Sequence, residues 1–235
     1  MSDPGGTLAP TVGLGVLHLF GSLRGTGDPD VAGIVHSVKQ AEADGLQVVT
    51  AAMLGHKADV GFMALGQDLW RLRRVQTDLQ EAGLHVTYSY VSLTELSEYA
   101  QGIPDEMKQT RLYPKLPPEG MTAFCFYPMS KRRGEDQGAN WYSLPFEARK
   151  EFMLGHGAVG RTFAGRILQL ITGSTGLDDW EWGVTLFGVH PDDLKECVYR
   201  MRFDEASARF AEFGPFLTGL VAPVEDVLRS VLADG

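Results

Sequence analysis

Four side chains with complementary chemistry lie in the second half of the chain. Tyr127 ends an apolar run, and Lys131 follows it closely. His156 lies in a stretch with helical spacing, and Gln169 interrupts an otherwise apolar run. A neutral imidazole can bind a metal, an ammonium can hold an anion, and a phenol can give up an electron with its proton. Together these residues could bind a metal, hold an anionic substituent and support a one-electron step.

Two glycines beside the histidine favour a flat ligand. Gly155 and Gly157 flank His156 in the predicted helix. Each glycine destabilises a helix interior by about 1 kcal/mol relative to alanine. That cost is explained if a bulky, flat group approaches the backbone, and the face of an iron porphyrin has this shape. Three plainer interpretations stay open: a hydrogen-bonded core histidine, a core aromatic at Tyr127 and a solvent-facing Gln169.

Composition excludes some classes of partner. The 235 residues carry a formal net charge of −9, which argues against a general nucleic-acid or anionic-membrane surface. No apolar run approaches the length of a membrane span, and the N-terminus lacks the pattern of a signal peptide. We therefore expect a soluble, cytoplasmic protein. Cys125 and Cys197 are interpreted as reduced core thiols, and Asp178, Asp179 and Glu181 as a charged loop.

The spacing of apolar residues predicts an order of strands and helices that occurs twice. The first set, strand–helix–strand–strand–helix–strand, comprises Thr11–Phe20, Pro29–Asp44, Leu46–Met53, Ala58–Leu65, Asp68–Ala82 and Leu84–Val91. The second set has the same order: Met121–Tyr127, Pro145–Val159, Ala164–Thr172, Trp180–Phe187, Pro191–Phe203 and Pro215–Val221. A short helix over Val224–Leu232 is expected to follow the second set.

The repeated order predicts an α+β fold with two tandem ferredoxin-like (βαββαβ) halves. We expect the halves to span residues 11–95 and 121–222, with the second half holding the ligand. Residues 96–120 carry prolines and mixed charge and are expected to form a connector or loop. The two sheets could pack face to face or join into one barrel.

Several motifs resemble the coproheme decarboxylases of the chlorite dismutase-like superfamily. In the second half these are YPMSKRR, HGAVGR and TGLDDWEWGVTLF, within a similarity that runs from Arg111 to Leu220. The first half matches more loosely, best in LGHKADVGFMAL and VTYSYVSLTEL. The resemblance implies a dimeric α+β barrel type of subunit, assembled as a homopentamer. It agrees with the duplicated element order.

The resemblance implies a role for each side chain of the four. His156, in HGxxGR, is expected to be the axial ligand of the haem iron, with Asp204 or Glu205 as its hydrogen-bond partner. Tyr127, in YPM, is expected to act as a redox tyrosine through a tyrosyl radical. Gln169 stands where chlorite dismutases carry an arginine. A neutral amide cannot hold an oxychlorine anion by charge, so Gln169 favours decarboxylation.

Lys131, the fourth of these side chains, and three further positions are implied to contact the substrate. Lys131 and Arg111 match cations that bind propionates. Met129 matches a residue that lines the same pocket, and Ser207, in FDEASAR, matches another propionate contact.

The implied activity is a step of haem biosynthesis. Hydrogen peroxide would drive the oxidative decarboxylation of two propionates of iron coproporphyrin III to vinyl groups, giving haem b. The porphyrin would be both substrate and cofactor, and transient contact with the preceding ferrochelatase is expected. The alternatives are a chlorite dismutase or haem peroxidase, and a non-catalytic haem-binding protein.

Overall fold

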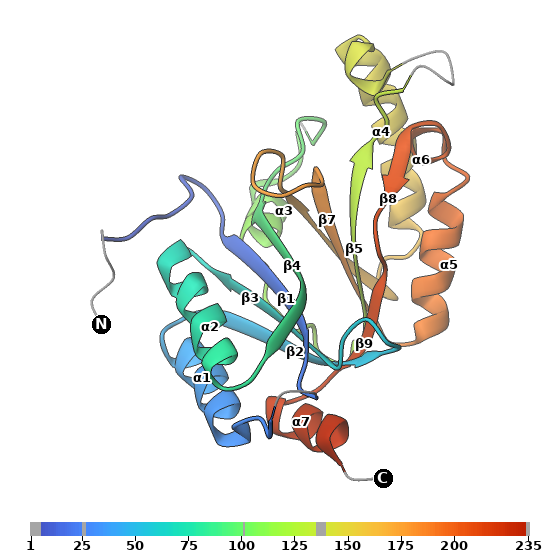
Figure 1. Ribbon diagram of the computed structural model, residues 1–235. Coiled ribbons are helices and arrows are strands. Elements are labelled where there is room, and N and C mark those ends of the chain that lie inside the picture. Colours follow the sequence, from blue (N-terminus) through green and yellow to red (C-terminus); the bar gives the residue numbers. More distant parts are fainter. Residues whose placement is uncertain (1–5, 25–26, 101, 135–139, 234–235) are drawn as a thin grey trace.

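The computed structural model describes residues 6–24, 27–100, 102–134 and 140–233. The first half contains β1 (Gly15–Ser22), α1 (Val31–Ala43), β2 (Gln47–Leu54), β3 (Val60–Gly66), α2 (Leu69–Glu81) and β4 (His85–Thr94). The second half repeats the order with β5 (Ala123–Lys131), α4 (Phe146–Arg161), β6 (Ile167–Gly173), β7 (Trp182–Gly188), α5 (Pro191–Met201) and β9 (Leu217–Val221). The predicted duplication is confirmed (Figure 1).

The strands of the two halves join into one closed barrel. The strand order is β4-β1-β3-β2 in the first half and β9-β5-β7-β6 in the second, which is the same ferredoxin-like order. Antiparallel pairing of β2 with β9 and of β4 with β6 connects the halves on both sides. A short strand, β8 (Ala211–Phe213), extends the sheet beside the end of β5. Of the two arrangements left open by the sequence, the structure has the barrel.

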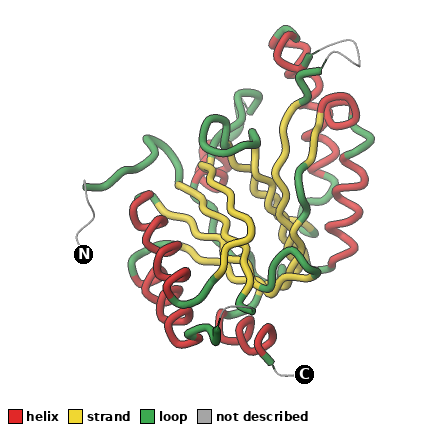
Figure 2. Tube along the Cα trace, in the orientation of Figure 1, coloured by secondary structure: helices red, strands yellow, loops and turns green. Residues whose placement is uncertain are grey.

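Helices lie outside the strands in two groups (Figure 2). On one side, α1 and α2 bury an apolar layer against the first half of the sheet, with α7 (Val224–Leu232) at its edge. On the other side, α5 covers part of the second half. The barrel interior is filled by a third cluster rich in aromatic side chains, including Phe20, Tyr90, Phe124, Phe126 and Phe187. The outer face of the second half is thus the face available for a site.

The connector over residues 96–120 contains a helix that the sequence analysis did not predict. Asp105–Leu112 forms helix α3 there, with Asp105 and Glu106 in its first turn and Arg111 in its last. These charges complement the helix dipole, but prolines at both ends conceal the helical pattern. Only Leu112 of this helix is buried, and its carbonyl accepts a hydrogen bond from Thr94 Oγ1 at 2.8 Å.

Other differences are short elements and displaced ends. The structure adds a 3-10 turn over Trp141–Ser143 and helix α6 (Glu205–Phe210), both too short to produce a periodic pattern. Strand β6 begins at Ile167 rather than Ala164 because Gly165 takes a positive φ of 81°. None of the helices in the described part of the chain has the length and apolar character needed to cross a membrane.

His18 is a buried titratable group in the barrel interior. Its Nε2 lies 3.0 Å from Thr185 Oγ1, and its ring packs 4.2 Å from that of Phe126. Burial lowers the pKa of His18 from 6.5 to about 3. The unfolded chain therefore binds a proton below pH 6.5 that the folded chain does not bind until about pH 3.

We expect His18 to make the protein less stable in mild acid. The free energy of unfolding should fall as pH drops below 6.5, with a slope that approaches about 1.4 kcal/mol per pH unit. Urea denaturation at a series of pH values measures this slope. His18→Gln should remove most of it, whereas the control His85→Gln, at an exposed position, should retain it. Equal slopes in the two variants would contradict the assignment to His18.

Candidate functional site

Strand β5 presents alternate residues to the two sides of the barrel wall. Phe124 and Phe126 point into the barrel, whereas Tyr127, Met129 and Lys131 belong to the outer face. Three of the residues singled out from the sequence therefore share one face of one strand.

Neighbouring strands extend this face. The register pairs Tyr127 with Val184 of β7, and Val184 with Ile171 of β6. The next row of side chains on the same face runs from Cys125 through Leu186 to Gln169. The Nε2 atom of Gln169 lies 3.5 Å from Cys197 Sγ on α5. Ile171 is 43% exposed, so helices do not cover this part of the face. The result is a largely apolar surface with a phenol on one side and an amide on the other.

Helix α4 carries His156 and packs beside α5 and α6. None of its side chains is buried, although it is 16 residues long. A Cβ at Gly160 would lie 3.7 Å from Gln169 Nε2 and 3.7 Å from Met201 Cε, so this end of α4 approaches the sheet closely. His156 lies one turn before Gly160 and therefore on the same side of the helix. The structure thus brings His156 and Gln169 to the same region.

A buried carboxylate orients the imidazole. His156 Nδ1 lies 3.0 Å from Asp204 Oδ2 and 3.4 Å from Ser207 Oγ. Burial by itself raises the pKa of Asp204, but hydrogen bonds from His156 and Ser207 outweigh it, and the pKa lies below its usual value. An anionic Asp204 accepts the Nδ1 proton, which leaves the lone pair of Nε2 available to a metal. Of the two partners considered from the sequence, Asp204 makes this contact.

Lys131 is a buried ammonium beside an aromatic ring that the sequence did not indicate. Its Nζ lies 4.6 Å from the centre of the Trp141 ring and 3.4 Å from the Ala206 carbonyl oxygen. Burial lowers the pKa of Lys131 to about 8, while Asp204 and Glu181 raise it. Below about pH 8 the amine is mainly charged and suited to a carboxylate.

Glu181 lies in the predicted charged loop, between β6 and β7, but its side chain is buried. It is 3% exposed, and its Oε2 accepts a hydrogen bond of 2.8 Å from the backbone N–H of Lys131. Its position between two tryptophans, Trp180 and Trp182, was the available signal that this carboxylate lies in an apolar setting. The sequence analysis predicted the loop but not the burial of this carboxylate.

Tyr127 is buried among aromatic rings. It stacks on Phe216 with 4.5 Å between ring centres and meets the edge of Phe213 at 5.8 Å. Burial raises the pKa of the phenol, so it keeps its proton at neutral pH.

The two remaining predicted residues lie in different surroundings. Arg111 is exposed on α3, and no contact in the described chain joins it to Lys131 or His156. Ser207 is buried on α6 and contacts His156, as given above. Their roles as propionate contacts stay predictions.

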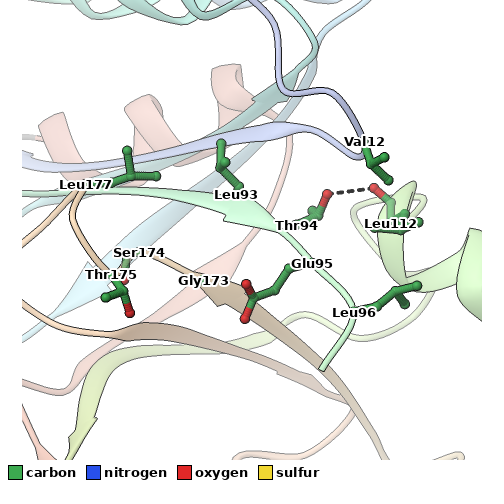
Figure 3. A pocket seen from close by; sticks show the side chains of 10 residues that line it. All are labelled: Val12, Leu93, Thr94, Glu95, Leu96, Leu112, Gly173, Ser174, Thr175 and Leu177. Atoms are coloured by element: carbon green, nitrogen blue, oxygen red, sulfur yellow. Dashed lines mark hydrogen bonds between the residues drawn. The ribbon is translucent and has the colours of Figure 1, made fainter. Parts of the chain in front are cut away.

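A cavity of about 330 Å³ lies at another place, beside the ends of β4 and β6 (Figure 3). Glu95 is the charged residue in its lining, and its Oε1 accepts a hydrogen bond of 3.2 Å from Trp182 Nε1. Neither this cavity nor a second one beside Asp178 is lined by His156 or Tyr127. Whether an iron porphyrin fits must therefore be judged from the side chains that could bind it, His156, Lys131 and Tyr127, and from the poorly covered sheet face.

Those side chains fit the group. Nε2 of His156 is available, Asp204 fixes the ring, and an ammonium and a phenol lie on the facing strand. Residues 30–222 match the family model for chlorite dismutase. The chain belongs to the chlorite dismutase family.

Individual relatives agree with this membership. The chain is 45% identical over 185 residues to a protein of Natronomonas pharaonis named as a candidate haem-binding protein, a match covering 72% of this chain and 30% of that protein. A haem-binding protein from Thermus thermophilus has a structure with a TM-score of 0.82, 35% identity and full coverage of both chains. A variant chlorite dismutase of Candidatus Nitrospira defluvii, with a TM-score of 0.76, 19% identity and coverage of 97% and 99%, shares the fold.

Asp204 should stabilise the fold as well as the imidazole. It caps α6 by accepting a hydrogen bond of 3.2 Å from Ser207 N–H, so Asp204→Ala should lower the free energy of unfolding by about 1–2 kcal/mol. Asp204→Asn keeps a capping oxygen and should cost less. Urea denaturation measures both variants, with the exposed neighbour Glu205→Ala as the control. An effect of Glu205→Ala as large as that of Asp204→Ala would refute the cap.

Proposed function

We propose that this member of the chlorite dismutase family decarboxylates iron coproporphyrin III with hydrogen peroxide and gives haem b. The observation that carries the proposal is the common outer face of β5, on which Tyr127 and Lys131 lie near the helix of His156. Binding a haem needs only the histidine. A phenol and a buried ammonium on one strand face are the additional groups that chemistry on a propionate requires.

Residues of α4, α6 and the sheet would hold the porphyrin. His156 would bind iron through Nε2, with Nδ1 held by Asp204 at 3.0 Å. The uncovered part of the sheet around Ile171 would lie against the macrocycle. When bound, the iron porphyrin supplies the centre that activates peroxide. The names of the Natronomonas and Thermus relatives support haem as the kind of ligand.

The overall reaction balances for each propionate. The propionate becomes a vinyl group, CO₂ and a proton, and two electrons leave it. Hydrogen peroxide takes up two electrons and two protons and becomes two molecules of water. Two rounds therefore consume two molecules of peroxide and release two of CO₂.

Tyr127 would transfer the oxidising equivalent to the substrate. Its buried phenol keeps its proton, so it loses an electron and the proton together. The phenoxyl radical would abstract a hydrogen atom from the β-carbon of a propionate and so recover its O–H bond. As CO₂ leaves, a second electron would pass to the oxidising equivalent that remains from hydrogen peroxide, and the vinyl group would result. Lys131 would hold the reacting carboxylate by charge.

Gln169 bears on the alternative activities. It is the amide on the sheet face nearest the C-terminal end of α4, and it carries no charge to hold chlorite. Chlorite dismutation or general peroxidase activity is therefore the second candidate function. A haem-binding protein without catalytic activity would have no use for Tyr127 and Lys131 together. The homopentamer, the cytoplasmic location and the contact with ferrochelatase stay predictions from the resemblance, as does Arg111 as a propionate contact.

Tyr127→Phe should abolish vinyl formation while iron coproporphyrin still binds. Phenylalanine keeps the packing on Phe216 but has no O–H bond to break. Mass spectrometry of the porphyrin during peroxide titration measures the product, and a Soret titration measures binding. We expect a loss of rate of at least about a hundredfold. Vinyl formation at the rate of the unchanged protein would refute the radical role.

His156→Ala should remove the protein ligand to iron. Electron paramagnetic resonance of the ferric complex should lose the signature of axial imidazole coordination, and added imidazole should restore it. Affinity should drop by about tenfold or more because the ring and its Asp204 support are both lost. His36→Ala, at an exposed position on α1, is the control. An unchanged spectrum in His156→Ala would exclude it as the axial ligand.

A further inference from the structure

Glu181 is tied to the end of β5 that carries Lys131. Its Oε2 accepts a hydrogen bond of 2.8 Å from Lys131 N–H, and its Oε1 accepts one of 2.7 Å from Arg133 Nη2. Its own N–H lies 3.2 Å from the Met129 carbonyl oxygen and 3.2 Å from Ser130 Oγ. The side chain is 4% exposed. This residue therefore contacts three successive residues of β5 and one beyond its end.

The hydrogen bonds of Glu181 do not by themselves explain why this position carries a charged carboxylate. The amide oxygen of a glutamine could accept the same hydrogen bond from Lys131 N–H. Burying a carboxylate is costly unless another charge compensates it. The partner Arg133 has a side chain that is 70% exposed and screened by water, so its charge offsets that of the carboxylate only in part. Lys131 itself is the buried cation on the segment that Glu181 contacts.

The charged groups around Lys131 come from three elements. Glu181 lies beside the start of β7, Asp204 at the N-terminus of α6, and Arg133 just after β5. Asp204 is already held by His156, which leaves Glu181 as the carboxylate attached to the lysine's own strand. Both carboxylates raise the pKa of Lys131 against the effect of burial.

We propose that Glu181 is a positioning residue that keeps Lys131 protonated and fixes the strand end from which Lys131 holds a propionate of the substrate. The proposal rests on the proposed function for the role of the propionate, but the coupling between Glu181 and Lys131 does not. Arg133 opposes Glu181, because its positive charge offsets the carboxylate.

The test measures the titration of Lys131 in the protein without porphyrin. Lysine labelled with ¹³C at Cε reports its protonation by NMR, and Lys131→Met identifies the signal. Glu181→Gln should lower the pH at which Lys131 loses its proton by about one unit, a tenfold loss of proton affinity. Arg133→Gln should raise that pH. Shifts in the same direction, or no shift in either variant, would overturn the proposal, because a purely structural effect has no reason to change sign.

A second measurement separates this inference from the proposed function. The affinity of Glu181→Gln for iron coproporphyrin III, followed by Soret absorbance, should drop near pH 8 and recover at lower pH, where Lys131 is charged again. Iron octaethylporphyrin, which has no carboxylates, should bind both proteins equally. A titration shift without a change in coproporphyrin affinity would support the coupling and overturn the role of Lys131 in holding the substrate. If Glu181→Gln does not fold, the upward shift in Arg133→Gln is decisive.

Discussion

The hydrogen bond between His156 and Asp204 is the constraint on which the site depends. It joins α4 to α6 across 3.0 Å and fixes which imidazole nitrogen is available. Asp204 also caps α6, and the carbonyl of Ala206 in that helix lies 3.4 Å from the ammonium of Lys131. One helix of six residues therefore sets the position of the metal-binding ring and touches the cation on the facing strand.

The two faces of β5 have different roles, because one lines the barrel interior and the other carries candidate site residues. Inward residues of β5, such as Phe124 and Phe126, fill an aromatic core, while the outward residues pack against α5. Because the side chains of a strand alternate, a slip of one residue would place Tyr127 and Lys131 inside the barrel. Pairing of β5 with β7 and β9 prevents that slip, so the stability of the barrel and the placement of the site depend on the same register.

Helix α4 behaves unlike the other long helices of the described chain. Helices α1, α2 and α5 each bury several side chains, whereas α4 buries none. A helix with few buried contacts has little stability of its own and can adjust to what it binds. Its glycines reduce that stability further, because glycine costs more than alanine in a helix interior. These properties suit a helix whose packing is completed by a ligand.

The sequence alone determined the fold class, because alternation and helical spacing repeat with the same order in both halves. It also singled out His156 and Tyr127 as candidates by residue type and motif. It could not determine which carboxylate holds His156, since Asp204 and Glu205 are adjacent and only the start of α6 distinguishes them. Nor could it place Glu181 beside Lys131, because the two residues are 50 positions apart and meet only through strand pairing. Local patterns specify elements, whereas burial and charge pairing arise when distant segments pack together.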